Sequence, residues 1–407
     1  MRNLRLLLVL AVVYVDMLGV GLAFPVLPRL LQQFLHGDTS RTAYVYGLLA
    51  SAYALMQFFF APLFGALSDR FGRRPLILAS LGGSAVSYLA MAMAPNLAVL
   101  AAARLLAGVM GGSFTAAGAY LADITPPEKR SQSFGLIGAA LGLGLITGPA
   151  VGGMLGSVDL HLPFLAAGLL CLGNLAFGYF ALPESLAPQN CRAFRLADAN
   201  PVGALRLIAR YPGIVALMVV FVLAAFANRA AEMIWVFYTG YRFHWGPAEI
   251  GISMAFIGVI FVAGQGGFTR ILLPRIGERG SILTGLFFSA AVCVLYGAVG
   301  KGWMLFCVMP LAAVAWPIAQ PAIQGLMSRA VAADEQGLLQ GAMASITSLT
   351  SIAAPPLWTG IFGYSVSPAS PIHLPGAAFY IAAAVFMLAL ALALRWELQA
   401  PPQPVVA

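Results

Sequence analysis

Charged side chains are scarce in this 407-residue sequence. Asp, Glu, Lys and Arg together make up 9% of it, whereas hydrophobic residues make up 61%. Soluble domains carry roughly 25% charged residues, so this composition excludes a water-soluble globule. We therefore expect an integral membrane protein.

Residues that carry catalytic or metal chemistry are also few. The chain has four cysteines without a CxxC spacing, and its four histidines stand singly near predicted helix ends. Neither GxSxG nor HExxH occurs, and such motifs mark nucleophilic and zinc-dependent hydrolases. We expect no enzyme, no metal site and no cofactor, and we interpret the cysteines as small buried hydrophobic residues.

Long apolar runs are abundant instead. A helix needs about 20 residues to cross a hydrocarbon core of roughly 30 Å. The runs are too long for barrel strands, and backbone groups in lipid must pair within their own segment, so the fold class is an all-α membrane protein. The first run, which contains Asp16, has no small-residue cleavage site and is interpreted as a retained helix. Twelve spans are predicted, at 6–28, 43–67, 75–95, 97–122, 132–157, 162–183, 213–240, 248–273, 281–299, 302–328, 336–362 and 375–396.

Positive charge is distributed unevenly between the loops. With the N-terminus in the cytoplasm, sixteen Lys and Arg residues fall on the cytoplasmic side and four on the opposite side, while Arg104 and Arg229 lie within spans. The positive-inside rule then places both termini in the cytoplasm. The net charge of +8 reflects this asymmetry, and we expect no binding of nucleic acid.

The longest polar break lies near the midpoint of the chain. It predicts a six-helix half at 1–183, a cytoplasmic linker at 184–212 and a second half at 213–407. "RFGRRP" from Arg70 returns as "RIGERG" from Arg275, and Pro149 has a counterpart 206 residues later. Two parallel repeats around a midplane site are an architecture of secondary transporters. Asp69 corresponds to Pro274, so we expect the charged gating chemistry in the first half.

Charged residues inside the spans are candidates for function, because each costs about 2.5–3.5 kcal/mol at a helix centre. Asp16 in the first span is either a proton-coupling carboxylate whose pKa is raised by desolvation or a structural, permanently paired group. Arg104 cannot lose its proton. It either lowers a neighbour's pKa and holds an anion, or donates to backbone carbonyls. Arg229 and Glu232 are three residues apart on one helix face. They form a structural pair or, alternatively, Glu232 faces a cavity together with Asn228 and Trp235, which share its helix face.

The fifth span reads "GLGLITGPAVGGMLG". Glycines recur every four residues on it, which permits close helix packing, and Pro149 removes one backbone hydrogen bond. The stripe is either a close helix contact that lets the helices of a transporter tilt against each other or a packing motif of a static protein.

Four stretches together resemble the motifs of the major facilitator superfamily: "DMLGVGLAFPVLPRLL" from Asp16, "GALSDRFGRRP" from Gly65, "RLLAGVMGG" from Arg104 and "GLGLITGPAVGG" from Gly142. The similarity is strongest to the branch of tetracycline and multidrug proton antiporters. It implies two six-helix pseudo-symmetric halves, and export of a small, partly apolar, drug-like compound in exchange for protons by alternating access. A proton gradient then supplies the energy, and the protein works as a monomer in the inner membrane. A proton-coupled symporter or a lipid or metabolite transporter of the same fold is the alternative.

The resemblance also assigns residues. It implies proton coupling by Asp16 and Arg104. Glu232 is our third candidate for proton coupling from its position in the seventh span alone, because its pair with Arg229 departs from what that branch leads us to expect. The gating loop comprises Gly65, Asp69, Arg70, Gly72, Arg73 and Arg74, with Asp123 as the partner of the arginines and the start of the eleventh span facing Asp69. The antiporter helix motif comprises Gly144, Gly148, Pro149, Gly152 and Gly153.

One departure concerns the substrate. Tetracycline carriers have an acidic residue at the position of Ser87 and another in the ninth span, and this chain has neither. The resemblance therefore does not extend to a metal-chelated tetracycline. Amphipathic groups suited to a bulky ligand, which are equally common in helix packing, are our candidates for substrate binding: Gln57, Asn228, Trp235, Tyr238, Trp316 and Gln320.

Overall fold

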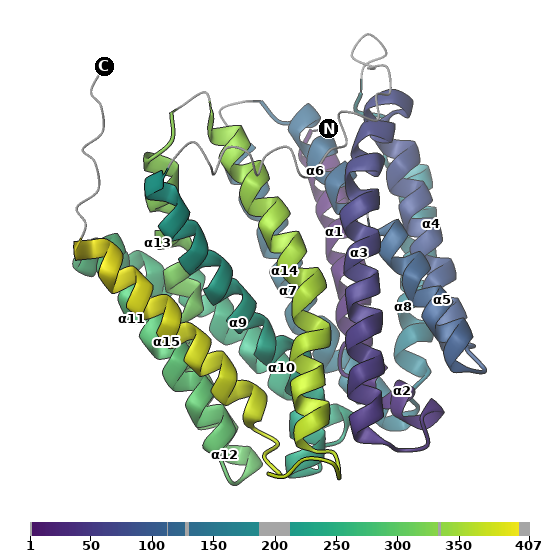
Figure 1. Ribbon diagram of the computed structural model, residues 1–407. Helices are drawn as coiled ribbons and strands as arrows, with labels where there is room; N and C mark the ends of the chain where they lie inside the picture. The colour runs from purple at the N-terminus through teal and green to yellow at the C-terminus, as the bar shows by residue number, and fades with distance from the viewer. Residues whose placement is uncertain (1, 112, 127–129, 187–211, 333–334, 399–407) are drawn as a thin grey trace. The chain divides into compact units, whose positions relative to one another are not determined.

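The computed structural model describes residues 2–111, 113–126, 130–186, 212–332 and 335–398, and in these ranges every regular element is a helix (Figure 1). The helices of the first part of the chain are α1 (Arg2–Ala23), α2 (Leu27–Phe34), α3 (Thr39–Phe71), α4 (Arg73–Ala92), α5 (Leu97–Met110), α6 (Ser113–Ile124), α7 (Arg130–Val158) and α8 (Leu162–Ala181). Those that follow are α9 (Pro212–Phe243), α10 (Pro247–Ala263), the π-helix η5 (Gly264–Phe268), α11 (Thr269–Ala298), α12 (Gly302–Val308), the 3-10 helix η6 (Met309–Val314), α13 (Trp316–Arg329), α14 (Gln336–Ser365) and α15 (Ala377–Leu398).

All twelve predicted spans coincide with helices, which confirms the all-α fold class. Three spans are divided by residues that disfavour a helix. The first continues into α2 past Pro25 and Pro28, the fourth breaks into α5 and α6 at Gly111, and the tenth holds the 3-10 turn η6 with Pro310. Most of the predicted linker, 187–211, lies outside the described residues.

The eighth and ninth predicted spans lie in one apolar run, Pro247–Ala298, of 52 residues. A straight helix of that length would measure about 78 Å, more than twice the roughly 30 Å of a hydrocarbon core. The backbone changes direction at Gly277, where φ is 69° and ψ is 178°, a conformation open almost only to glycine. The run therefore contains two crossings.

Contacts group the chain into two compact units, which we describe separately. Unit 1 comprises Met1–Asp38, Ala52–Asn200 and Trp245–Gly258, and unit 2 comprises Thr39–Ser51, Pro201–His244 and Val259–Ala407. The first part of α3 thus belongs to unit 2 and the first part of α10 to unit 1. These two segments lie 206 residues apart and occupy equivalent places in the proposed repeats.

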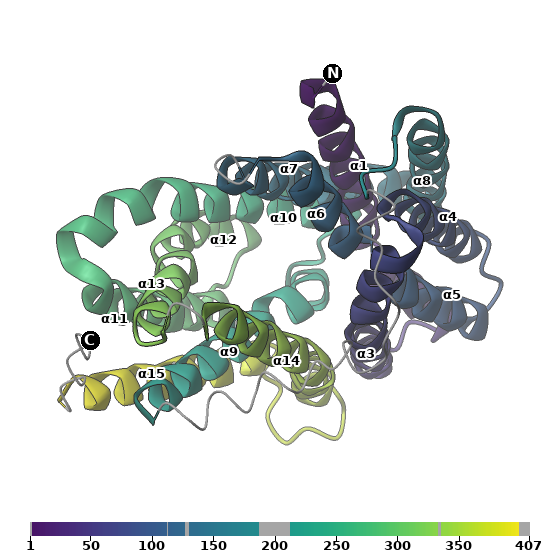
Figure 2. The same ribbon diagram turned by 90° about the horizontal axis from the view of Figure 1, so that it is seen from above.

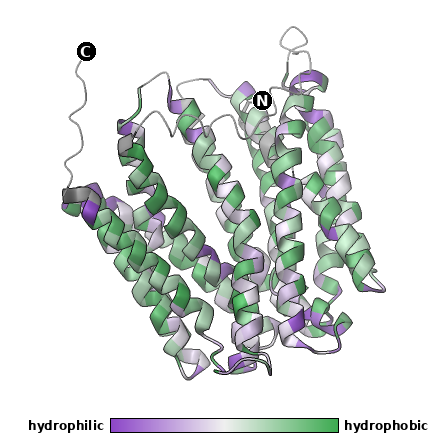
Figure 3. Ribbon diagram, in the orientation of Figure 1, coloured by the Kyte–Doolittle hydropathy of each residue, from purple (hydrophilic) through white to green (hydrophobic). Residues whose placement is uncertain are grey.

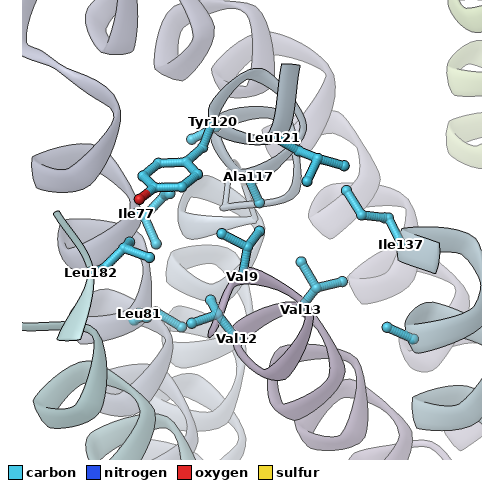
Figure 4. Packing of buried hydrophobic residues seen from close by; sticks show 12 residues of the cluster. Val9, Val12, Val13, Ile77, Leu81, Ala117, Tyr120, Leu121, Ile137 and Leu182 are labelled. Atoms are coloured by element: carbon cyan, nitrogen blue, oxygen red, sulfur yellow. The ribbon is translucent and has the colours of Figure 1, made fainter. Parts of the chain in front are cut away.

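In unit 1, α1 contacts α7 and α8, and α4 contacts α5, α6 and α8 (Figure 2). The core near the first turns of α1 consists of fully buried aliphatic side chains around Tyr120 of α6, whose hydroxyl donates to the Pro183 carbonyl at 2.9 Å (Figure 4). Val9, Val12 and Val13 of α1 belong to one cluster with Ile77 and Leu81 of α4, and Val13 lies on the side of Ile137. Lipid is as apolar as these side chains, so close packing rather than exclusion of water holds the helices together.

In unit 2, α9 contacts α14 and α15, and α11 contacts α13 and α15. Aromatic rings fill this core, among them Trp358, Phe362 and Phe379, all with 0% exposure. In both units apolar residues dominate the helices, and hydrophilic residues gather mainly at helix ends (Figure 3). Apolar helices with hydrophilic ends are what a membrane-spanning arrangement requires.

Candidate functional site

Asp16 lies on α1 at a half-buried position. Its carboxylate interacts electrostatically with the hydroxyls of Tyr53 on α3 and Tyr88 on α4, and with the thiol of Cys171 on α8. Electrostatic partners from three other helices of unit 1, α3, α4 and α8, therefore lie near one carboxylate within a membrane-spanning segment.

Arg104 of α5 belongs to the same cluster. Its guanidinium carbon lies 4.2 Å from the centroid of the Tyr53 ring, a cation–π contact, and Gln57 Nε2 donates to the Tyr53 hydroxyl at 2.9 Å. Close packing of α5 on α3 makes this possible, since a Cβ atom at Gly108 would lie 2.8 Å from the Tyr53 carbonyl oxygen. Arg104 Nε is buried and has no hydrogen-bond partner in the part of the chain that the structure describes. The guanidinium thus retains a free donor beside the Asp16 cluster.

The structure brings together three residues that the sequence singled out, Asp16, Arg104 and Gln57. Sequence reasoning missed Tyr53 and Tyr88, which join them. A tyrosine in an apolar helix carries no signal that separates this position from ordinary packing. The helical spacing between Tyr53 and Gln57, four residues, could have indicated that the two share a face.

The gating loop is centred on Arg73, which is 9% exposed. Arg73 Nε forms an ion pair with Asp123 Oδ2 at 3.2 Å, and Nη1 contacts Asp69 and donates to Ser68 Oγ at 2.7 Å. The Ser68 hydroxyl donates in turn to the Gly65 carbonyl at 2.9 Å. One guanidinium therefore connects the end of α3 to the end of α6.

Glu184, just after α8, caps the start of α4 and was not anticipated from the sequence. Its two carboxylate oxygens accept the backbone N–H groups of Arg73 at 2.9 Å and Arg74 at 3.2 Å. An acidic group at a helix N-terminus also interacts favourably with the helix dipole. Gly72 adopts φ 101°, and a Cβ atom there would collide with the Glu184 carboxylate. Arg74 donates to the Tyr179 carbonyl at 2.6 Å.

Two more contacts complete the loop. The Arg70 guanidinium lies 5.0 Å from the centroid of the Phe71 ring, and the hydroxyl of Ser185 donates to Asp123 Oδ2 at 3.0 Å. Residues that follow α8 thus hold both the gating loop and its acidic partner on α6.

The glycine stripe of α7 has two faces, and the first is turned toward α1. A Cβ atom at Gly144 would lie 2.7 Å from Met17 Cβ, one at Gly148 would lie 2.6 Å from Gly21 Cα, and one at Gly152 would overlap the backbone of Leu22. Real Cβ atoms do not approach so closely. The backbones of α1 and α7 are therefore in direct contact.

The second face is turned toward α10, within unit 1. A Cβ atom at Gly153 would lie 2.9 Å from Gly251 Cα, and one at Gly251 would overlap the Pro149 carbonyl oxygen. Since Pro149 lies inside α7, the hydrogen bond that its missing N–H would make within the helix is absent beside this crossing. The antiporter motif therefore packs against two helices at once.

In unit 2, Arg229 and Glu232 of α9 form an ion pair, with 2.6 Å between Nη1 and Oε2. Arg229 Nη2 donates to Ser351 Oγ of α14 at 3.1 Å. The side chains of the pair are 30% and 37% exposed, respectively, and Asn228 beside them is half-buried. The pair that the sequence predicted is present, and a serine missed by sequence reasoning is its third member.

The aromatic candidates for substrate binding are packed inside unit 2. Trp235, Tyr238 and Trp316 are 2%, 0% and 6% exposed. The Tyr238 hydroxyl donates to the Tyr296 carbonyl at 2.6 Å, while Trp316 packs on a phenylalanine of α9. Gln320 is half-buried. Contact between these residues and a substrate stays a prediction.

Comparison with known proteins identifies the family. The model of the Major Facilitator Superfamily matches residues 9–355. The chain is 41% identical over 388 residues to the class C tetracycline resistance protein of Escherichia coli, covering 95% of this chain and 96% of that protein. It is 39% identical to the class G tetracycline resistance protein of Vibrio anguillarum, covering 88% and 90% of the two chains.

Solved structures agree with the fold. The human organic anion transporter is 25% identical with a TM-score of 0.68, and the alignment covers 96% of this chain and 99% of that one. A bacterial homologue of the human lysosomal transporter Spinster has a TM-score of 0.78 at 15% identity, with 99% of both chains covered. The chain, a multi-pass membrane protein and not an enzyme, therefore belongs to the major facilitator superfamily and is closely related to its tetracycline resistance proteins.

Proposed function

We propose that the protein exports a small, partly apolar, drug-like compound in exchange for protons by alternating access. The relationship to tetracycline resistance proteins over nearly the full length supports drug efflux by proton antiport. The observation that carries the proposal is the cluster of Asp16, Tyr53, Tyr88 and Arg104 within the spans of unit 1.

Asp16 is the proton carrier in this proposal. A carboxylate in a membrane-spanning helix can accept a proton from one side and release it to the other, whereas Arg104 keeps its charge at any accessible pH. The fixed charge of Arg104 favours the ionised carboxylate and so promotes release of the proton. Glu232 is a second candidate for proton coupling.

Energetics permit one proton per cycle. One charge that crosses 100 mV releases about 2.3 kcal/mol, which sustains a gradient of roughly 50-fold for a neutral compound at about 1.4 kcal/mol per tenfold step. A single titrating carboxylate would therefore be sufficient.

We propose that the gating loop stabilises the state closed at the cytoplasmic side. The contact of Arg73 with Asp123 orders the loop, and Asp69 would gain about 0.3–1 kcal/mol near the positive N-terminal end of α14. The two six-helix halves, joined by the linker at 184–212, would move around a midplane site. We propose both termini in the cytoplasm, insertion in the inner membrane, and a monomer as the working unit.

The substrate class departs from tetracycline in this proposal. Ser87 stands where tetracycline carriers have an acidic residue. It is fully buried, and its hydroxyl donates to the Gly83 carbonyl of its own helix at 2.7 Å. A residue in that position supplies no carboxylate to a metal chelate. We expect tetracycline to be a poor substrate in comparison with unchelated compounds.

The test is transport in inverted membrane vesicles with an imposed pH gradient. The native chain should accumulate drug-like compounds when the interior is acid, and Asp16→Asn should abolish this accumulation while the protein remains inserted. Asp159→Asn, in an exposed loop, is the matched control and should transport normally. Undiminished pH-driven transport by Asp16→Asn would reject the assignment, and accumulation under the opposite gradient would indicate the symporter alternative.

A further inference from the structure

Near the middle of α9 the partly exposed polar side chains are charged and amide groups, Asn228, Arg229 and Glu232. Ala227, Ala230 and Ile234 are at most 1% exposed, so these sides of the helix are packed. Arg229 and Glu232, near the middle of α9, keep about a third of their side chains exposed. A charged pair at that depth avoids lipid and faces space that water or a ligand can enter.

Arg229 is held independently of its partner. Its Nη2 donates to Ser351 Oγ, and that hydroxyl donates to the Thr347 carbonyl at 2.9 Å in the same helix. The guanidinium therefore stays in place when Glu232 turns away. Glu232 uses one oxygen, Oε2, for the pair. The site thus presents a cation that is also anchored to α14, beside its anionic partner on α9.

Charge balance selects the ligand. A purely acidic compound on Arg229 would leave the Glu232 carboxylate without a partner unless it took up a proton, and a proton that accompanied the compound outward would oppose antiport. A purely basic compound on Glu232 would leave Arg229 without a counter-ion, and a guanidinium cannot neutralise itself. Among ligands that separate the pair, a compound with both an acidic and a basic group leaves neither charge unpaired, which matters in a low-dielectric site.

We propose that Arg229 and Glu232 form a substrate site for amphoteric compounds, in which the acidic group of the ligand replaces Glu232 on Arg229 and the basic group binds Glu232. This inference rests on the proposed export function and specifies its substrate class. In this inference neither member of the pair gains or loses a proton when the compound binds, so it favours Asp16 over Glu232 as the proton-coupling group.

The experiment compares the native chain with the double variant Arg229→Met, Glu232→Gln. Both charges are removed together because removal of one would leave the other unpaired in the membrane. The probes are ciprofloxacin as the amphoteric compound, nalidixic acid as the acid, ethidium as the cation and chloramphenicol as the neutral compound. The matched control is Glu278→Gln, Arg329→Gln, which removes another ion pair of unit 2 at a helix end.

In vesicles with an imposed pH gradient, the double variant should raise the half-saturating concentration of ciprofloxacin at least about tenfold, equivalent to about 1.4 kcal/mol, and leave that of chloramphenicol unchanged. Ciprofloxacin should also raise the melting temperature of the purified native protein and of the control variant, but not that of the double variant. This second measurement does not depend on proton coupling.

Two results would overturn the inference and leave the export function standing. One is equal handling of ciprofloxacin by the native chain and the double variant, which would make the pair purely structural. The other is a native chain that moves ethidium, nalidixic acid or chloramphenicol but neither binds nor moves ciprofloxacin. Failure of the native chain to move any probe under the pH gradient would instead count against the proposed function itself.

Discussion

The segment of unit 1 that contains Gly72 and the segment of unit 2 that contains Gly277 have a similar backbone at the glycine, but the residue that follows it has opposite charge. Both glycines have positive φ, 101° and 69°, and they lie 205 residues apart. The next residue is Arg73 in one loop and Glu278 in the other. Arg73 pairs with Asp123 near the end of α6, and Glu278 pairs with Arg329 at the end of α13.

The surroundings of the two pairs differ as well. Arg73 has a side chain that is 11% exposed, with Asp69, Asp123 and Ser68 around it. Arg329 is 67% exposed, and Glu278 Oε2 has no hydrogen-bond partner in the described residues beyond that ion pair. Both sites thus have a positive-φ glycine followed by a residue in an ion pair, and the residue after the glycine is basic in unit 1 and acidic in unit 2. The sequence predicted gating chemistry in the first half alone, and an ion pair in the second loop was not foreseen.

Gly72→Ala should have the largest effect among changes that test this comparison. Positive φ at a residue with a Cβ costs about 1–3 kcal/mol, and displacement of the Glu184 cap adds about 0.5–2 kcal/mol. Gly277→Ala is the matched control, because a Cβ atom at Gly277 would have no neighbouring atom within 4 Å, so this variant should pay the backbone cost alone. Thermal unfolding in detergent measures both, and equal losses would show that the Glu184 contact is unimportant.

Arg73→Gln should destabilise the protein by about 1.5–3 kcal/mol, the usual contribution of hydrogen bonds to charged groups. Arg329→Gln, whose side chain is mostly in solvent, should cost about 0–1 kcal/mol. The midpoint of thermal unfolding should therefore decrease more in Arg73→Gln than in Arg329→Gln. A larger loss for Arg329→Gln would reverse our view of which loop is the better ordered.

Exchange of the charges in the first loop sharpens the same point. Arg73→Glu combined with Asp123→Arg reproduces the polarity of the second loop. It should recover part of the stability lost in Arg73→Gln, though not all, because Asp69 would then repel the new glutamate. If the double variant is less stable than Arg73→Gln, unit 1 requires a positive charge at position 73.

Glu184→Gln should have a smaller effect than Gly72→Ala or Arg73→Gln, about 0.5–2 kcal/mol for a weakened helix cap. An amide keeps one oxygen as an acceptor for the N–H groups of Arg73 and Arg74 but loses the charge that favours a helix N-terminus. Vesicle transport and thermal unfolding are the measurements, with Glu249→Gln, the acceptor for Gly246 N–H at 2.8 Å, as a cap of similar chemistry elsewhere. If Glu184→Gln transports and unfolds like the native protein, Arg73 alone holds the loop in place.

The fold was predictable because hydropathy alone locates helices in a membrane protein. All twelve spans were found in this way. The breaks inside spans were less accessible, since Gly111 and Pro310 stand in apolar sequence where a continuous helix is equally compatible with the pattern.

The candidate site was predictable only in part. Asp16, Arg104 and the pair of Arg229 and Glu232 stood out because charge is costly in lipid. The groups that hold them did not, since Tyr53 and Ser351 are common in helices and their importance arises from contacts between distant segments. Glu184 was hidden for the same reason, because its partners lie more than a hundred residues earlier in the chain.

The contact of Gly148 with Gly21 limits how the carrier can move. Where two backbones touch, no layer of side chains lies between the helices, so we expect α1 and α7 to move together as a rigid pair. Asp16 is part of α1, and α10 contacts the opposite face of α7 at Gly153. If Asp16 carries the proton as we propose, protonation acts on an assembly of helices, and any displacement of the carboxylate must carry α7 with it.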